Sequence, residues 1–227
     1  MFDGILLIDK PKGWTSFDVV AKVRGMVRAE TGQKKPKVGH TGTLDPLATG
    51  LLVLVLGKYT KRVPELSKTD KTYEVTMCLG QTSTTGDEEG EKAAVSDKVP
   101  SEQELLGVIR QFVGEISQIP PAYSAIKVNG QRAYKLARAG KEVVLESRKA
   151  TIYSLELRRY AYPEVDFVVR VSSGTYIRTL VEDVGKKLGT GAYTSALRRT
   201  TVGSFDEAQA MPIEGLSATT ILASLIA

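Results

Sequence analysis

Short apolar stretches separated by polar turns run along most of this chain. Residues 4–9 and 51–56 are nearly continuous apolar runs of strand length, which is typical of buried strands. Residues 71–79 instead alternate apolar and polar side chains, which predicts a strand with one buried face. The same criteria predict further strands at residues 150–157, 165–172 and 191–200.

Apolar residues at helical spacing predict three longer helices. The first begins at Ser16, a suitable N-cap residue. The second is opened by Ser101 and Glu104, which have the spacing of a capping box and precede an apolar run. The third is opened by residues 173–178, and its apolar residues, from Ile177 onward, lie on one face. Shorter helices are expected at residues 132–139 and 219–226.

Composition places the chain among globular proteins of the cytoplasm. Of its 227 residues, 42% are hydrophobic and 25% are charged, and no apolar run reaches the roughly 18 residues of a membrane span. The single cysteine, Cys78, fits a reducing compartment, and with one histidine, His40, it cannot build a Cys/His zinc site. The net charge of +5 agrees with a polyanionic partner without identifying one.

Residues 39–50 form a glycine-rich loop before the predicted strand at 51–56, and the loop carries Asp45 and His40. Asp45 precedes a proline, so a structural turn is the ordinary interpretation. The loop contains no other charged side chain besides Asp45, however, and such a carboxylate is able to act as a nucleophile or general base. Both interpretations are open on the residues alone.

The loop Gly-His-Thr-Gly-Thr-Leu-Asp-Pro-Leu-Ala-Thr-Gly resembles the signature of the TruB family, the bacterial tRNA pseudouridine-55 synthases. The resemblance implies the α+β pseudouridine synthase fold, with a central mixed, mostly antiparallel sheet flanked by helices. It also implies a catalytic domain over residues 1–210, with a thumb-like RNA-binding insertion at about 120–149. The remaining residues, 211–227, would form a short tail with no PUA domain. Other stretches similar to family motifs are residues 4–16, 71–75, 120–127, 174–178 and 191–200.

The resemblance also assigns roles to particular side chains. Asp45 would be the catalytic nucleophile, and Arg178 would pair with it and hold the carboxylate ionised. Tyr73 would stack on the extruded uracil, whereas periodicity alone predicts a core aromatic residue there. The other expected substrate-binding residues are His40, which would fill the space of the vacated base, Leu197 in the uracil pocket, Lys61 and Tyr176.

Three basic stretches are candidates for RNA contact. Residues 28–37 hold four cations and one acid ahead of the loop with Asp45, and residues 119–149 interleave cations with aromatics. A wet surface and a solvated helical hairpin are the alternatives. Lys10 and Lys12 are either phosphate contacts or part of a solvated turn. In the polar loop at 80–90, Asp87 matches a family acid, but Ser83 and Thr84 stand where an earlier acid is usual.

The resemblance therefore implies isomerisation of uridine 55 to pseudouridine in the tRNA T arm, by base flipping and without a metal or an organic cofactor. The protein is expected to act as a monomer. Two other classes stay open on the residues. One is a hydrolase in which His40 activates a hydroxyl, although no Gly-x-Ser-x-Gly elbow is present. The other is an RNA-binding module without catalytic activity.

Overall fold

The computed structural model describes residues 2–128 and 130–227, and the chain forms two compact units. The first, called here the N-terminal unit, comprises Met1–Tyr73 and Arg198–Ala227, and the second, the central unit, comprises Glu74–Leu197. Strands β4 (Lys71–Leu79) and β12 (Ala192–Val202) contribute residues to both units. The predicted α+β fold with a mixed, mostly antiparallel sheet is confirmed.

The N-terminal unit is built around the buried strand β3 (Thr49–Leu56). Antiparallel to β3 run β1 (Gly4–Lys10) and β2 (Val38–His40), and the end of β12 pairs with it in parallel. The apolar runs predicted at 4–9 and 51–56 therefore form neighbouring strands of one sheet. Their core residues pack together because both strands are apolar on both faces. One core cluster contains Ile5, Leu7, Leu51, Val53, Val55 and Val202.

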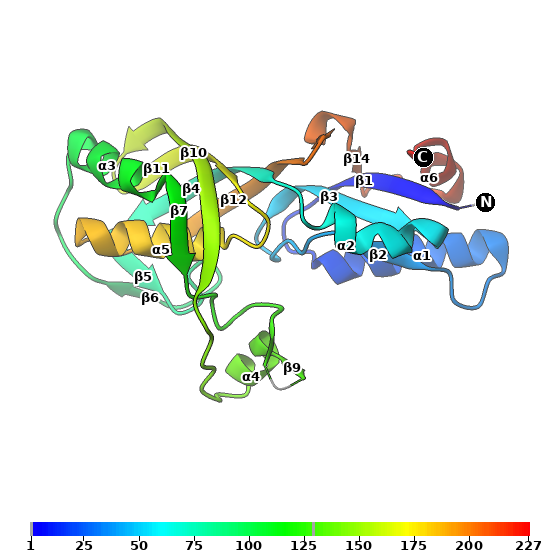
Figure 1. Ribbon diagram of the computed structural model, residues 1–227, viewed down its shortest axis with the longest axis horizontal. Helices are drawn as coiled ribbons and strands as arrows, with labels where there is room; N and C mark the ends of the chain where they lie inside the picture. Colours follow the sequence, from blue (N-terminus) through cyan, green and yellow to red (C-terminus); the bar gives the residue numbers. More distant parts are fainter. Residues whose placement is uncertain (1, 129) are drawn as a thin grey trace. The chain divides into compact units, whose positions relative to one another are not determined.

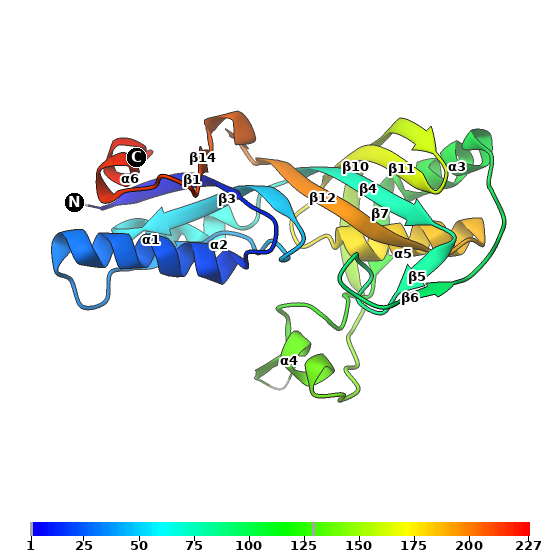
Figure 2. The ribbon, with the colours of Figure 1, turned by 180° about the vertical axis from the view of Figure 1, so that it is seen from behind.

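Helix α1 (Ser16–Thr31) runs along this sheet (Figure 2). Its N-cap residue is Thr15, whose side chain forms a capping box with Asp18, so the prediction that Ser16 caps the helix is wrong. Ser16 lies inside the helix and is buried. The helix extends to Thr31 and thus includes the start of the basic stretch at residues 28–37.

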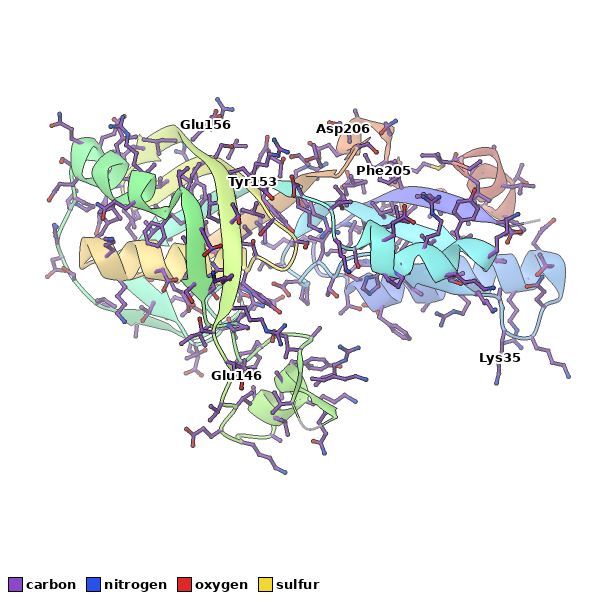
Figure 3. All side chains as sticks on the ribbon, viewed as in Figure 1. Lys35, Glu146, Tyr153, Glu156, Phe205 and Asp206 are labelled. Atoms are coloured by element: carbon purple, nitrogen blue, oxygen red, sulfur yellow. The ribbon has the colours of Figure 1, made fainter. Side chains whose placement is uncertain are left out.

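Short elements complete the N-terminal unit. After β3 come a 3-10 turn, η1 (Gly57–Arg62), and α2 (Val63–Leu66). The two ends of the chain are joined, because Ile5 and Ile226 exchange backbone hydrogen bonds of 2.8 and 2.9 Å. The remaining elements are β13 (Phe205–Asp206, labelled in Figure 3), η3 (Glu207–Gln209), β14 (Met211–Pro212) and α6 (Ala218–Ala223).

The central unit contains a sheet in the order β12-β4-β11-β10-β7. The long strand β10 (Arg148–Ala161) is antiparallel to both β11 (Glu164–Val171) and β7 (Gly114–Gln118). Figure 1 shows α5 (Ile177–Leu188) alongside this sheet and α3 (Glu102–Ile109) near one end of it. The predicted capping box of Ser101 and Glu104 is confirmed. A short turn, η2 (Arg110–Phe112), follows α3, and β5 (Gln81–Ser83) pairs with β6 (Lys92–Ala94).

The segment expected to form a thumb leaves the sheet of the central unit after β7 and returns at β10 (Figure 1). It contains β8 (Lys127–Val128), β9 (Gln131–Arg132) and the predicted short helix α4 (Ala133–Arg138). Most of its described side chains are exposed or half-buried, as expected for a segment outside the core. None of the helices in the described residues is both long and apolar enough to cross a membrane.

Candidate active site

The loop that carries Asp45 connects β2 to β3 in the N-terminal unit, and Asp45 itself is half-buried. The backbone on both sides of Asp45 is fixed by hydrogen bonds. The amide of Leu44 donates to Ser16 Oγ at 2.8 Å, and Ser16 Oγ donates to the Leu44 carbonyl at 3.1 Å. The Pro46 carbonyl accepts from the Gly13 amide at 2.8 Å and from Lys10 Nζ at 3.3 Å. The main chain that carries the Asp45 carboxylate is therefore held rigidly on both sides.

Lys10 is fully buried, with 0% of its surface exposed. Its ammonium group also donates to the carbonyls of Trp14 at 2.6 Å and Pro11 at 2.9 Å. A buried ammonium must be satisfied by hydrogen bonds, and these carbonyls supply them. Both interpretations of Lys10 from sequence, as a phosphate contact and as part of a solvated turn, are therefore wrong. Lys12 is exposed.

Arg199 supports the start of the same loop from inside the N-terminal unit. It is 1% exposed and donates to the carbonyls of Leu51 at 2.8 Å, Gly42 at 3.1 Å and Thr43 at 3.4 Å. Each of these bonds has an ionised donor, which makes it stronger than a neutral one. Arg199 therefore connects β3 to the loop and holds two of its carbonyls.

A second buried cation, Lys71, lies beside Arg199 under this loop. A Cβ atom at Gly42 would lie 3.5 Å from Lys71 Cε and 3.5 Å from Arg199 Nη1. Lys71 Nζ donates to the carbonyls of Thr69 at 2.6 Å and Ser67 at 3.2 Å. Burial lowers the pKa of Lys71 to about 8, and repulsion by Arg199 adds to this shift.

Sequence reasoning missed these two cations. A signal was present in β12, where alternation places Arg199 on the same face as Leu197, which is also buried. Lys71 begins the alternating pattern of β4 on the same face as Tyr73. A charged residue at an inward position of a strand indicates a buried group that needs polar partners.

In the central unit, Arg178 lies in the first turn of α5 and is 4% exposed. Its Nε is 3.6 Å from Oδ2 of Asp87, which is 3% exposed. Its two terminal nitrogens donate to the carbonyls of Thr85 and Tyr123, each at 2.8 Å. Asp87 is thus a partner of Arg178 that the sequence did not predict. The pair predicted between Arg178 and Asp45 stays a prediction.

Asp87 is held by its own loop. Its Oδ1 accepts hydrogen bonds from the hydroxyl of Thr85 and from the amide of Glu89 at 3.1 Å. Gly86, between them, has a φ of +73°, and a Cβ there would lie 2.7 Å from Oε1 of Glu182. Burial raises the pKa of Glu182, and the charge of Arg178 opposes this shift. The loop and the first turns of α5 therefore form one close-packed charged cluster.

The other predicted residues of the N-terminal unit lie in different environments. His40 is half-buried at the end of β2, and Lys61 is exposed on η1. Tyr73 is 7% exposed on β4, as the alternating pattern predicts for a core-facing side chain. Its expected role in stacking on a base is a prediction that this burial does not test.

Two predicted residues remain in the central unit. Tyr176 precedes α5, and its main chain is bound by the buried Gln118, whose side chain accepts from the Tyr176 amide and donates to its carbonyl, both at 3.1 Å. Leu197 is 7% exposed on β12. Gln118 was not singled out from sequence, because a lone glutamine at the end of a strand gives no signal of its partner.

In the part of the chain that the structure describes, no three His, Cys, Asp or Glu side chains are grouped so as to hold a metal ion. The loop itself presents a carboxylate, that of Asp45, on a fixed backbone. Such a group serves as a nucleophile or a base.

Comparison with known sequences gives matches over nearly the whole chain. Residues 28–177 match the TruB family pseudouridylate synthase (N terminal domain), and residues 178–224 match the tRNA pseudouridylate synthase B C-terminal domain. The tRNA pseudouridine synthase B of Pseudomonas aeruginosa is 48% identical over 213 residues, which are 94% of this chain and 68% of that protein. The protein of the same name from Burkholderia mallei is 46% identical over 218 residues, covering 96% and 70%.

Solved structures agree with these matches. A chain in the crystal structure of a Cbf5-Nop10-Gar1 complex superposes with a TM-score of 0.71 at 33% identity, covering 94% of this chain and 53% of that one. A chain in the structure of an H/ACA RNP bound to a substrate RNA containing 2'-deoxyuridine gives 0.69 at 30% identity, covering 95% and 52%. This chain thus spans about half the length of those two chains. By its sequence and its fold, the chain belongs to the TruB family of pseudouridylate synthases.

Proposed function

We propose that this protein converts uridine 55 in the T loop of tRNA to pseudouridine, as a monomer in the cytoplasm, with Asp45 as the group that attacks the flipped nucleotide. Membership of the TruB family supports the reaction. The observation that carries the choice of Asp45 is the fixing of the backbone at Leu44 and Pro46, on either side of it. Holding a reacting group in one orientation is a large part of enzymatic rate enhancement.

The reaction is an isomerisation within one nucleotide. The bond from C1′ to N1 of uracil breaks, a bond from C1′ to C5 forms, and the proton on C5 is exchanged for one on N1. No electrons are gained or lost, so no redox partner is needed. The base must first leave its stack, which costs a few kcal/mol that aromatic contact in the enzyme offsets. Tyr73 supplies that contact, and His40 fills the space left in the RNA.

Arg178 holds Asp45 ionised for the attack. Support comes from the way Arg178 is itself held, since its guanidinium is buried and fixed by Asp87 and two carbonyls. A cation that cannot turn away is preorganised to stabilise a carboxylate without further reordering. Tyr176, Leu197 and Lys61 complete the binding site for the uracil and its phosphate.

The segment at about 120–149 closes on the T arm of the tRNA. Its composition supports this role, because it interleaves cations and aromatic residues on a largely exposed surface. The carbonyl of Tyr123, near the start of this segment, accepts a hydrogen bond from Arg178. The segment is thus in contact with the residue proposed to pair with Asp45.

The decisive experiment compares wild type with the Asp45→Asn variant on an unmodified tRNA transcript, with pseudouridine mapped by position. We expect wild type to modify position 55 and Asp45→Asn to lose at least about a thousandfold in rate, because the amide is a poor nucleophile. Binding of the transcript should change little. Asp97→Asn, an exposed site with the same charge change, is the control. A wild-type protein that forms no pseudouridine, or an Asp45→Asn protein of normal rate, would disprove the proposal.

A further inference from the structure

A groove of about 1010 Å³ lies in the N-terminal unit between α1, the loop after it and β2. Every residue that lines it belongs to this one unit. Its floor includes the aliphatic side chains of Val20, Val38 and Val63. We call it the α1 groove. Cations line it from two elements: Arg24 and Arg28 on α1, and Lys34, Lys35 and Lys37 in the loop.

The charge of the α1 groove is of one sign. Five lysine and arginine residues line it, and no aspartate or glutamate does. Among the described residues, none of these five forms an ion pair with a carboxylate. Asp18 caps its own helix and Glu65 pairs with Arg62 at 3.0 Å. Glu30, at the end of α1, is exposed and does not line the groove. Several uncompensated cations along one groove attract a partner with repeated negative charge.

The groove also carries an exposed aromatic ring. Phe17 is 65% exposed at the first turn of α1, and the guanidinium carbon of Arg24 lies 5.9 Å from the centre of its ring. Arg24 is fixed in turn by a 2.9 Å hydrogen bond to the Val38 carbonyl. Lys35, which also lines the groove, extends from the loop after α1 (Figure 3). Proteins bind single-stranded nucleic acid with aromatic side chains beside cations, because the bases stack on the rings and the cations neutralise the phosphates.

We propose that the α1 groove binds a segment of the substrate RNA next to the target uridine, with its lysines on phosphates and Phe17 stacked on a base. The inference rests on the proposed function. His40 supports it, because this residue both lines the groove and begins the connection that carries Asp45. A strand lying in the groove therefore reaches the start of the loop that carries Asp45. An acidic protein surface fits less well, because its carboxylates would pair with the cations but would not stack on the exposed ring of Phe17.

The test removes three groove lysines together, as Lys34→Ala/Lys35→Ala/Lys37→Ala, in an Asp45→Asn background so that only binding is read. The probe is a fluorescently labelled, unmodified tRNA transcript, titrated at several salt concentrations. The matched control is Lys68→Ala/Lys186→Ala/Lys187→Ala, three exposed lysines outside the groove with the same charge change. We expect the groove variant to bind about tenfold more weakly or worse. Its plot of log affinity against log salt should be less steep by about 2, as three lost phosphate contacts predict.

Phe17→Ala supplies an independent measurement. Because stacking releases no counterions, its loss should weaken binding at least about fivefold with an unchanged salt slope. The control is Leu222→Ala, which truncates another exposed apolar side chain of the same unit and should leave affinity unchanged. Circular dichroism spectra identical to wild type would show that each variant is folded.

Several outcomes would overturn the assignment. Equal losses in the groove and control lysine variants would indicate a diffuse effect of net charge. An unchanged salt slope in the groove variant would show that its lysines contact no phosphate. Loss of binding to phosphatidylglycerol vesicles with unchanged RNA binding would assign the groove to a membrane instead. Failure of wild type to make pseudouridine would disprove the proposed function, yet the binding measurements would still decide the groove.

Discussion

Two loops of the molecule, one in each unit, carry an aspartate and are both held by a buried arginine. Arg199 binds the loop of Asp45 through the Gly42 and Thr43 carbonyls, and Arg178 binds the loop of Asp87 through the Thr85 carbonyl. The carboxylates differ, however. Asp87 is 3% exposed and bound by its own loop and by Arg178, whereas Asp45 is half-buried.

The comparison separates two uses of the same side chain. A carboxylate that is fully enclosed and satisfied by hydrogen bonds fixes its neighbours, and here Asp87 orients Arg178. A carboxylate on a fixed backbone whose side chain is only half-buried can still be reached by a substrate. Under the proposed function, Asp87 is a positioning residue and Asp45 is the catalytic residue, and the following variants test that division.

The largest effect is expected for Asp87→Asn. Removing one member of a buried ion pair costs about 3 kcal/mol, because a buried cation loses its compensating charge. We expect the free energy of unfolding in urea to fall by about this amount, and kcat to fall while KM for tRNA stays near the wild-type value. Asp97→Asn is again the matched control. An Asp87→Asn protein as stable as wild type would show that Asp87 does not hold Arg178.

Arg199→Met should come next. Methionine resembles the aliphatic part of the arginine side chain but lacks the guanidinium group. The carbonyls of Leu51, Gly42 and Thr43 therefore lose their donor. A displacement of the loop by about 1 Å is enough to lower kcat about a hundredfold. Single-turnover rates on a tRNA transcript measure it, with the exposed Arg158→Met as control. A fall in affinity with an unchanged rate would instead assign Arg199 to RNA binding.

Ser16→Ala should have a smaller effect. It removes one hydroxyl that makes two buried hydrogen bonds with the main chain of Leu44. Leaving these groups unsatisfied costs about 1 to 3 kcal/mol. Urea unfolding measures the loss, and kcat should fall several-fold because the same bonds fix the residue before Asp45. Ser204→Ala, at an exposed site, should change neither quantity.

The smallest effect is a pH dependence due to Lys71, whose pKa falls from 10.5 to about 8 in the folded protein. Between these values the unfolded chain binds the proton more tightly, so stability from this residue rises as the pH rises. From pH 7 to pH 9 the gain is about 1 kcal/mol. Urea unfolding should show this rise in wild type and in Lys68→Met, but not in Lys71→Met. The same pH dependence in all three proteins would contradict the assignment.

The periodic parts of this structure could be predicted from the sequence, since burial alone determines them. The alternation of residues 71–79 predicts β4 with both of its ends, and the spacing of Ser101 and Glu104 predicts the start of α3. The start of α1 was misplaced by one residue, because Thr15 and Ser16 are both good caps. The capping box selects Thr15, because the Thr15 amide donates to the Asp18 carboxylate and the Asp18 amide donates to the Thr15 hydroxyl.

The candidate site was harder to predict because its supports join residues far apart in the chain. The family resemblance supplied Asp45 and Arg178, but the contacts of Lys10 and Arg199 with loop carbonyls depend on tertiary structure. A lysine followed by proline suggests a solvated turn, and only the fold shows that it is fully buried. Hydrogen bonds to main-chain carbonyls cannot be predicted from residue type, because every residue has a carbonyl.

That last property has a consequence for changing the enzyme. The bonds that anchor the loop at Gly42, Thr43, Leu44 and Pro46 all end on peptide groups. Replacing the exposed side chain of Thr43 therefore leaves every one of these anchors in place. Libraries that vary residue 43 would therefore change the surroundings of a bound nucleotide while the hydrogen bonds that fix the main chain around Asp45 stay in place.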